Sequence, residues 1–329
     1  MKLAIVGATG LVGSIMLKVL EERNIQIEKL LPVGSARSKG KEITFRGQKH
    51  TVITPEEAID ERPDAALFSA GSDISKQYAE AFTEKGTYVI DNSSAFRLRD
   101  DVPLVIPEIN GTSLSKDTRL IANPNCSTIQ LLMGVFPLEQ KFGIERMIIS
   151  TYQSVTGSGV AAVNQLDEER KGGQPEKAYP HPIDLNCLPH CDDFEDNGYT
   201  KEEMKLVNES RKILEKPELA VSPTAVRVPV KGGHSESVNL TLSKPFEIQD
   251  IRDALSAMPG VVVLDNPAEN SYPMPINAEG KDEVFAGRIR KDESAKNSLN
   301  MWLVADNLRK GAATNTVQIL EKLKNIALS

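Results

Sequence analysis

The first 125 residues alternate short apolar runs with segments of helical spacing. Apolar runs at residues 3–6, 29–33, 65–68 and 88–90 are typical of strands buried in a parallel sheet. The segments that end at Arg23 and at about Lys85 have the spacing of helices. Small and polar residues follow the strand ends, where a doubly wound sheet opens its ligand crevice. This alternation predicts an α/β fold that begins with a Rossmann-like domain.

The pattern changes after residue 125. Residues 148–155, 225–230, 237–242 and 299–304 look like strands of another sheet, separated by helices and by a long loop at 172–199. Residues 312–326 have helical spacing and could return to the first domain. We therefore predict two domains. One is formed by residues 1–125 with a C-terminal helix at 311–329, and the other is an α+β domain formed by residues 126–310.

Composition narrows the class of protein. With 329 residues and 40% hydrophobic content, the chain can build two domains with ordinary cores. Its 46 acidic and 39 basic residues give a net charge of -7, which argues against a nucleic-acid partner. No apolar run reaches the length of a membrane span, and three cysteines are too few for a disulfide scaffold. We expect a soluble, cytoplasmic protein that binds neither nucleic acid nor a membrane.

A glycine-rich segment follows the first strand directly. Gly7-Ala8-Thr9-Gly10-Leu11-Val12-Gly13 lies between the strand and the first helical pattern. Glycines allow a tight turn and a close backbone approach to a pyrophosphate, which the helix N-terminus can bind. A turn without a ligand is the alternative, but the full strand-to-helix context favours a dinucleotide.

The segment after the second strand bears on which dinucleotide is bound. Residues 34–41 contain Ser35, Arg37 and Ser38 and no acidic residue. An acidic side chain here would bind the ribose 2′-hydroxyl, whereas Arg and Ser can receive a 2′-phosphate. The segment favours NADP over NAD, and a solvated basic loop is the alternative reading.

Cys126 lies where strand-like sequence turns into a helix. Residues 119–122 form a short apolar run, Pro124 breaks it, and residues 127–141 have helical spacing. The positive end of a helix dipole favours the thiolate, which is the nucleophilic form of a cysteine. For a lone cysteine, a small buried side chain that packs against the helix is the commoner role.

Arg227 and His234 occur in one glycine-bounded string of polar residues. A strand that ends in Arg227, followed by a glycine turn and His234, can bring a cation and an imidazole to one cleft. Histidine is the usual general acid or base near neutral pH. Taken alone, His234 would more often be a structural residue of the turn.

Eight strings, in one order along the chain, point to a known family. They are GATGLVG at residue 7, SARSKGK at 35, DNSSAFRL at 91, VPLVIPEIN at 102, NPNCSTIQ at 123, STYQSVTGSG at 150, RVPVKGGHSESV at 227 and GAATNTVQI at 311. With them the chain resembles the aspartate-β-semialdehyde dehydrogenases from end to end. The resemblance implies an NADP(H)-dependent oxidoreductase that converts β-aspartyl phosphate to aspartate β-semialdehyde through a cysteine thioester, in lysine, threonine and methionine biosynthesis. It also implies that the second domain is the catalytic and dimerisation domain of a homodimer or tetramer.

The resemblance also assigns roles to individual residues. Cys126 would attack the acyl phosphate, Gln153 would orient the acyl group, and His234 would act as acid/base toward the thiol and the tetrahedral intermediate. Arg227 would bind the α-carboxylate and Glu202 the ammonium, while Lys205 and Arg97 would take the phosphate, with Asn125 nearby. The implied cofactor-binding residues are Gly7, Thr9, Gly10, Leu11, Val12, Gly13, Ser35, Arg37, Ser38, Ser69, Gly71, Ser154, Gly157 and Asn315. Without the family, Glu202 and Lys205 would be read as a solvated surface pair.

Three other functions remain as alternatives. An N-acetyl-γ-glutamyl-phosphate reductase performs the same chemistry on an amide-blocked substrate, which has no ammonium for Glu202. A nonenzymatic NADP sensor would need the glycine motif but not Cys126, and a cysteine hydrolase would leave that motif without a use. We expect no metal, because the spacing of His181, Cys187, His190 and Cys191 fits no zinc pattern. The sequence gives Cys187 and Cys191 no role.

Overall fold

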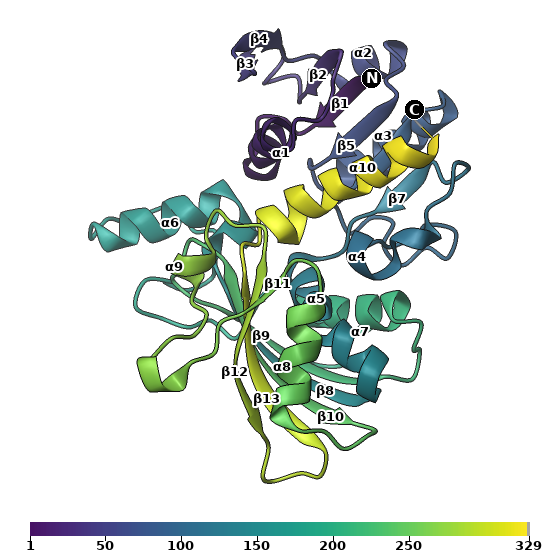
Figure 1. Ribbon diagram of the computed structural model, residues 1–329. Helices are drawn as coiled ribbons and strands as arrows, with labels where there is room; N and C mark the ends of the chain where they lie inside the picture. The colour runs from purple at the N-terminus through teal and green to yellow at the C-terminus, as the bar shows by residue number, and fades with distance from the viewer. Residues whose placement is uncertain (328–329) are drawn as a thin grey trace. The chain divides into compact units, whose positions relative to one another are not determined.

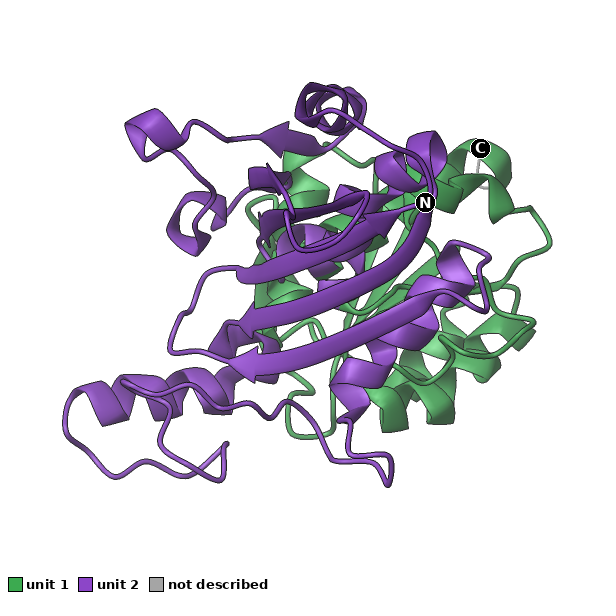
Figure 2. Ribbon diagram, turned by 90° about the horizontal axis from the view of Figure 1, so that it is seen from below, with its two compact units in different colours: residues 1–125, 312–329 green, residues 126–311 purple. Residues whose placement is uncertain are grey.

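The computed structural model describes residues 1–327 and divides into two compact units, which are coloured separately in Figure 2. The first unit contains residues 1–125 and the C-terminal segment from residue 312, and the second contains residues 126–311. Residues 328–329, the end of the predicted C-terminal helix, lie outside the described part.

The first unit is built on a five-stranded parallel sheet (Figure 1). In spatial order its strands are β2 (Lys29–Val33), β1 (Lys2–Val6), β5 (Ala65–Phe68), β6 (Tyr88–Asp91) and β7 (Leu120–Ala122). Its helices are α1 (Leu11–Glu22), α2 (Pro55–Asp60), α3 (Ser72–Glu84), α4 (Pro107–Asn110) and α10 (Thr314–Ala327), with a 3-10 turn at Gly111–Ser113. Every residue of β5 and β6 is buried, which explains why these strands read as unbroken apolar runs. The predicted Rossmann-like α/β fold is confirmed.

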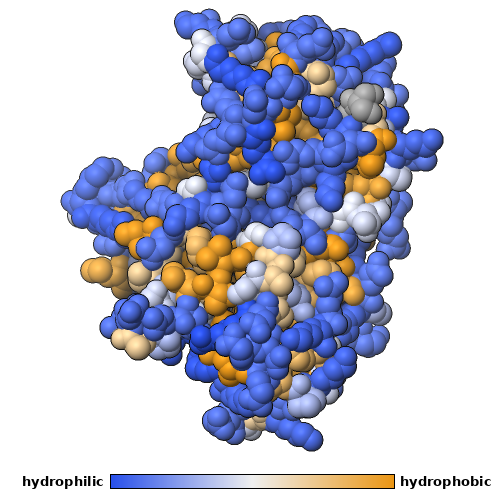
Figure 3. Space-filling view, in the orientation of Figure 1, coloured by the Kyte–Doolittle hydropathy of each residue, from blue (hydrophilic) through white to orange (hydrophobic). Residues whose placement is uncertain are grey.

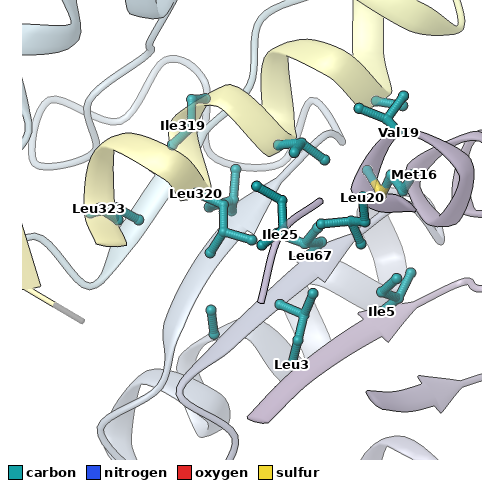
Figure 4. Close-up of a cluster of buried hydrophobic side chains, with 14 of the residues drawn as sticks. Leu3, Ile5, Met16, Val19, Leu20, Ile25, Leu67, Ile319, Leu320 and Leu323 are labelled. Atoms are coloured by element: carbon teal, nitrogen blue, oxygen red, sulfur yellow. The ribbon is translucent and has the colours of Figure 1, made fainter. Parts of the chain in front are cut away.

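The C-terminal helix belongs to the core of this unit. Leu320 and Leu323 of α10 pack in one apolar cluster with Leu3 of β1, Leu20 of α1 and Leu67 of β5 (Figure 4). All five side chains are fully removed from solvent. Burial of a leucine contributes roughly 1.5 to 3 kcal/mol, so the helix is held firmly although it follows the whole second unit in sequence.

A small hairpin in the first unit is absent from the sequence prediction. It consists of β3 (Glu42–Phe45) and β4 (Gln48–Thr51), joined through Arg46 and Gly47, both with positive φ. Its strands are mostly exposed and polar, so they carry too weak an apolar signal to be predicted.

The second unit is built on a six-stranded mixed sheet. In spatial order its strands are β11 (Val261–Val263), β12 (Val284–Lys291), β13 (Ser298–Ala305), β10 (His234–Leu242), β8 (Ile144–Gln153) and β9 (Ala220–Arg227). Its helices are α5 (Cys126–Phe142), α6 (Val160–Arg170), α7 (Lys201–Ile213), α8 (Ile248–Ala257) and α9 (Pro275–Ala278). Short 3-10 turns lie at Val155–Ser158 and Pro267–Glu269, and a π-helical turn at Arg309–Ala313 includes the last residues of this unit and the first residues of the C-terminal segment. Helix α5 packs on β8, β10, β12 and β13, while α7 packs on β9 and α8 on β11 and β12.

The opposite face of this sheet is only partly covered. The register places Ser150, Ser237 and Trp302 side by side on this face, and Tyr152 follows two residues after Ser150. Tyr152 and Trp302 pack with their ring centroids 5.3 Å apart, and Trp302 also lines a cavity of about 470 Å³ together with Met274. Figure 3 shows apolar residues gathered on the surface of the second unit around α9.

Several strand predictions for the second unit were wrong in their limits. The predicted strand 225–230 ends at Arg227 in β9, because Pro229 cannot donate to a sheet ladder. The predicted strand 148–155 begins earlier, at Ile144, and ends at Gln153, since Val155 starts a 3-10 turn. Strands β11 and β12 were missed, the first because it is three residues long and the second because charged residues interrupt it.

Candidate active site

The thiol of Cys126 lies at the start of a long buried helix. Helix α5 begins at Cys126, and the side chain is partly exposed. The positive end of the helix dipole favours the thiolate there. Gly311 makes room for this cysteine, because a Cβ atom at Gly311 would lie 2.8 Å from the Cβ of Cys126.

His234 lies against this thiol. Its Nε2 is 3.4 Å from the Cys126 Sγ, and its ring is completely buried at the start of β10. Its Nδ1 accepts a hydrogen bond of 3.0 Å from the backbone N–H of Ser154. Burial, and secondarily the positive charge of Arg227, lower the pKa of His234 to about 3, so the imidazole is neutral at physiological pH.

Arg227 brings a buried positive charge next to the imidazole. The side chain is 5% exposed, and its Nη1 donates a hydrogen bond of 2.8 Å to the Ser154 carbonyl. It forms no salt bridge with any of residues 1–327, and its buried Nε has no hydrogen-bond partner there. A buried guanidinium without a salt-bridge partner is costly unless an anion binds to it. The geometry therefore provides a binding position for an anionic group.

Gly157 keeps the space between Arg227 and His234 open. A Cβ atom at this position would lie 3.0 Å from Arg227 Nη1, and 3.1 and 3.2 Å from Cε1 and Nε2 of His234. These distances are shorter than ordinary van der Waals contact. A side chain at residue 157 would therefore press on both groups.

Glu202 and Lys205 are joined to the same region through Gln153. The Gln153 Nε2 donates a hydrogen bond of 2.9 Å to Glu202 Oε1, and the Lys205 Nζ lies 2.9 Å from Glu202 Oε2. Burial raises the pKa of Glu202, but the Lys205 charge and the hydrogen bonds from Gln153 and Lys205 outweigh it and lower this pKa to about 2. Lys205 also pairs with Asp192 at 2.7 Å. Glu202 is therefore a buried, ionised carboxylate.

Comparison with known proteins agrees with this geometry. Residues 2–117 match the family model described as semialdehyde dehydrogenase, NAD binding domain, and residues 135–310 match the semialdehyde dehydrogenase dimerisation domain. An aspartate-semialdehyde dehydrogenase of Aquifex aeolicus is 50% identical over 98% of this chain and 97% of its own length. One from Legionella pneumophila is 51% identical over 98% and 96%. The chain belongs to the aspartate-semialdehyde dehydrogenase family.

Solved structures of this family have the same fold. The crystal structure of aspartate semialdehyde dehydrogenase II from Vibrio cholerae superposes with a TM-score of 0.94 at 43% identity, covering 98% of both chains. A structure of that enzyme complexed with ASA gives the same TM-score at 42% identity, again covering 98% of both chains. The predicted family, enzyme class and function are confirmed, and these relatives do not favour the predicted alternative, an N-acetyl-γ-glutamyl-phosphate reductase.

The glycine motif of this family member has the local geometry of a phosphate cradle. Gly7 has a φ of +90°, and a Cβ at Gly13 would lie 2.2 Å from the Gly7 carbonyl oxygen. Helix α1 starts at Leu11, next to the exposed Thr9 and Gly10, and among the described residues no side chain caps it. Its first turn also lacks acidic residues, so its amide groups and dipole suit a pyrophosphate.

Other predicted cofactor residues follow β5 and β2, the two strands that flank β1 in the sheet. Ser69 follows β5 directly and donates its hydroxyl hydrogen bond to the Val6 carbonyl, while Gly71, with a φ of +90°, precedes α3. Ser35, Arg37 and Ser38 follow β2 as predicted, and Arg37 is exposed and forms no ion pair with the described residues.

Asn315, Arg97 and Asn125 are buried within the first unit. The Asn315 amide donates to the Val105 carbonyl at 2.9 Å and to the Asn123 side chain at 2.8 Å, which secures the segment that leads to Cys126. Arg97 donates a hydrogen bond of 2.7 Å to the Asn92 carbonyl. Asn125 is 7% exposed.

Several functional neighbours escaped the sequence prediction. Asn307 and Thr156 form hydrogen bonds with the Ser154 hydroxyl behind the imidazole, and Asp192 pairs with Lys205. Glu236 lies on the same face of β10 as His234 and is fully buried. The two-residue period from His234 could have indicated Glu236, but the other contacts join segments far apart in the chain.

The two cysteines other than Cys126 differ in their environment. Cys187 is exposed, whereas Cys191 is buried, and burial is the main cause that raises the pKa of Cys191 to about 11. Within residues 1–327, His, Cys, Asp and Glu side chains form no group of three that could hold a metal ion. In the same range, no helix has both the length and the apolar composition needed to cross a membrane.

Proposed function

We propose that this chain catalyses the NADPH-dependent reductive dephosphorylation of β-aspartyl phosphate to aspartate β-semialdehyde through a thioester on Cys126. The assignment to these residues rests on the Cys126 thiol, which lies at a helix start and 3.4 Å from a buried imidazole. The same unit holds the guanidinium of Arg227, whose buried Nε has no hydrogen-bond partner within residues 1–327. A thiolate is suited to the reaction because it attacks an acyl phosphate well and later leaves well. NADP(H), when bound, supplies the hydride that reduces the thioester.

Substrate binding uses charges of both signs. Arg227 binds the α-carboxylate of the substrate with its planar fork, which satisfies the buried charge described above. Glu202, held ionised by Lys205 and Gln153, receives the substrate ammonium. Gln153 orients the acyl group, while Lys205, Arg97 and Asn125 are proposed to act on the phosphate.

The first unit binds the dinucleotide, and NADP is the preferred form. Gly7, Gly10 and Gly13 shape the turn for the pyrophosphate, and Arg37 with Ser35 and Ser38 receives the 2′-phosphate. The exposed position of Arg37 after β2, without a competing carboxylate from the described residues, supports this assignment. Thr9, Leu11, Val12, Ser69, Gly71, Ser154, Gly157 and Asn315 are proposed to complete the cofactor site.

The decisive experiment is the reverse assay. Aspartate semialdehyde, phosphate and NADP are mixed with the enzyme, and NADPH formation is followed by absorbance while each component is omitted in turn. Cys126→Ala should abolish phosphate-dependent NADPH formation with little change in NADP affinity, while Cys187→Ala, which removes an exposed thiol, serves as the matched control. Turnover by the Cys126 variant, or a preference of the wild type for N-acetylglutamate semialdehyde, would overturn the proposal.

We also propose that the chain forms a homodimer through the partly covered face of the second-unit sheet. The match of residues 135–310 to a dimerisation domain supports this assignment, as does the pair formed by the exposed Tyr152 and the half-buried Trp302. Trp302→Glu should shift the sedimentation coefficient toward that of a monomer, because it places a charge in the apolar patch. Leu185→Glu, which places the same charge at an exposed loop position, is the control. If Trp302→Glu changes the sedimentation coefficient no more than this control does, the dimer does not form through this face.

A further inference from the structure

Thr151 and Gln153 lie on the same face of strand β8, and their side chains form a hydrogen bond. Residues two apart in a strand share a face, and both side chains are buried. The Thr151 hydroxyl donates to Oε1 of Gln153 at 3.2 Å. Gln153 is proposed to orient the acyl group of the substrate, so a contact that holds its amide also bears on the reaction.

The direction of the Gln153 amide follows from its two partners. The two ends of a side-chain amide have nearly the same shape, so their hydrogen bonds decide which end lies where. Nε2 donates to Glu202 Oε1 at 2.9 Å, and an ionised carboxylate can only accept. A turned amide would place its carbonyl oxygen against that carboxylate. Oε1 of Gln153 therefore faces the Thr151 hydroxyl.

The hydroxyl hydrogen of Thr151 is committed to this one acceptor. A hydroxyl group has a single hydrogen, and within residues 1–327 the Thr151 hydroxyl donates to Gln153. Glu236, the neighbour of Thr151 across the sheet, is also buried, but neither of its oxygens has a hydrogen-bond partner in that range. Loss of the hydroxyl would leave the buried Gln153 carbonyl oxygen without a donor from the described residues.

The same arrangement leaves one hydrogen of the Gln153 amide available. Nε2 has two hydrogens, and among residues 1–327 the amide donates only to Glu202. The register pairs Gln153 with Arg227 of β9, so the two side chains are neighbours on one sheet face. Gln153 can therefore offer a hydrogen-bond donor to a substrate oxygen next to the guanidinium that is proposed to bind the α-carboxylate.

We propose that Thr151 is a positioning residue of the reaction, whose hydroxyl holds the Gln153 carbonyl so that the free amide hydrogen is presented to the substrate. Thr151 has no exposed surface, so it acts through Gln153 and not by contact with the substrate. The inference rests on the proposed function and adds a residue to it. It follows from a contact between side chains, to which the sequence gave no role.

Three variants separate positioning from packing in the reverse assay. Thr151→Val keeps the shape without the hydroxyl, and Thr151→Ser keeps the hydroxyl. Thr87→Val is the matched control, because Thr87 is also fully buried and donates to the Pro63 carbonyl at 2.7 Å. Thr151→Val should lower kcat roughly 3- to 10-fold with the KM of NADP unchanged, while the other two stay within about 2-fold of the wild type. If Thr151→Ser is as slow as Thr151→Val, or if Thr87→Val loses as much, the positioning role is rejected.

A double-mutant cycle in urea unfolding tests the contact without reference to turnover. It compares the wild type, Thr151→Val, Gln153→Leu and the double variant at pH 7. Thr151→Val should lower the folding equilibrium constant less in the Gln153→Leu background than in the wild type, by a factor of roughly 2 to 10, because the amide that needs the hydroxyl is gone. Equal effects in both backgrounds would overturn the proposal even if the enzyme is fully active. Failure of the wild type in the reverse assay would instead reject the proposed function and leave this cycle unchanged.

Discussion

Replacement of Glu202 by glutamine removes the negative charge that joins Gln153 to Lys205. The two carboxylate oxygens accept hydrogen bonds of 2.9 Å from Gln153 Nε2 and from Lys205 Nζ. Glutamine keeps the size of the side chain but not its charge. Lys205 retains a second partner, Asp192 at 2.7 Å, so the substitution does not leave an isolated buried cation. The change therefore reports mainly on the ionised state of Glu202.

The expected magnitude follows from the pKa of this carboxyl. Its pKa is lowered from 4.5 to about 2 in the folded protein, against the opposing effect of burial. At about 1.4 kcal/mol per pH unit, this lowering corresponds to about 3 kcal/mol of stability at pH 7. Because the folded pKa lies below the unfolded one, this contribution is complete well above pH 4.5 and is lost as the pH falls toward 2. At pH 3.5 about 2 kcal/mol should remain.

Urea unfolding at pH 7 and pH 3.5 measures this difference. The free energy of unfolding of Glu202→Gln should be about 3 kcal/mol below the wild type at pH 7, with the gap narrowing by about a third at pH 3.5. Glu195→Gln, at an exposed position, is the matched control and should stay within about 0.5 kcal/mol of the wild type. A gap that is the same at both pH values would refute the reasoning, since it would arise from packing and not from charge.

Three further changes test the cofactor site, the reacting groups and a buried acid. In calorimetric titrations, Arg37→Ala should weaken NADP binding by roughly 1 to 3 kcal/mol more than it weakens NAD binding. Equal losses of binding free energy for the two cofactors would show that Arg37 does not recognise the 2′-phosphate. Gly157→Ala places a Cβ 3.0 Å from Arg227 Nη1 and should lower kcat/KM about 10-fold or more with little change in Tm, because it shifts reacting groups and not the core. Burial raises the pKa of Glu236 well above 4.5, so this carboxyl ionises in the unfolded chain first, and the free energy of unfolding falls as the pH rises above about 5. In urea unfolding, Glu236→Gln should remove up to about 1.4 kcal/mol per pH unit of this fall. If the free energy of unfolding of the variant falls with pH as steeply as that of the wild type, Glu236 does not have a raised pKa.

The first unit was the more predictable of the two because its strands are buried on both faces. Such strands appear in the sequence as short unbroken apolar runs, and the predicted 29–33 and 65–68 coincide with β2 and β5. In the second unit one sheet face is partly exposed, so β8 alternates buried and exposed residues and its limits were misplaced. How accurately the sequence predicted the strands therefore depended on how completely other elements cover each sheet.

The position of Cys126 could be predicted from sequence, whereas the state of its partner could not. Pro124 and the helical spacing after it suffice to place the thiol at the start of α5. His234, by contrast, accepts a hydrogen bond from the amide of Ser154, which lies 80 residues away in sequence. Local patterns indicate which side chains are present, but the hydrogen bonds of a buried side chain depend on contacts between distant segments.

Two glutamates of the second unit illustrate the same distinction for charge. Glu202 and Glu236 are both buried, and burial raises the pKa of each. For Glu202, the charge of Lys205 and the hydrogen bonds from Gln153 and Lys205 reverse this effect and keep the carboxylate ionised. Neither oxygen of Glu236 has a hydrogen-bond partner within residues 1–327, so nothing there opposes burial, which raises the pKa of this carboxyl well above 4.5. The charge of a buried acid in this unit is therefore set by its partners, and for Glu202 these are Lys205 first and Gln153 of β8 after it.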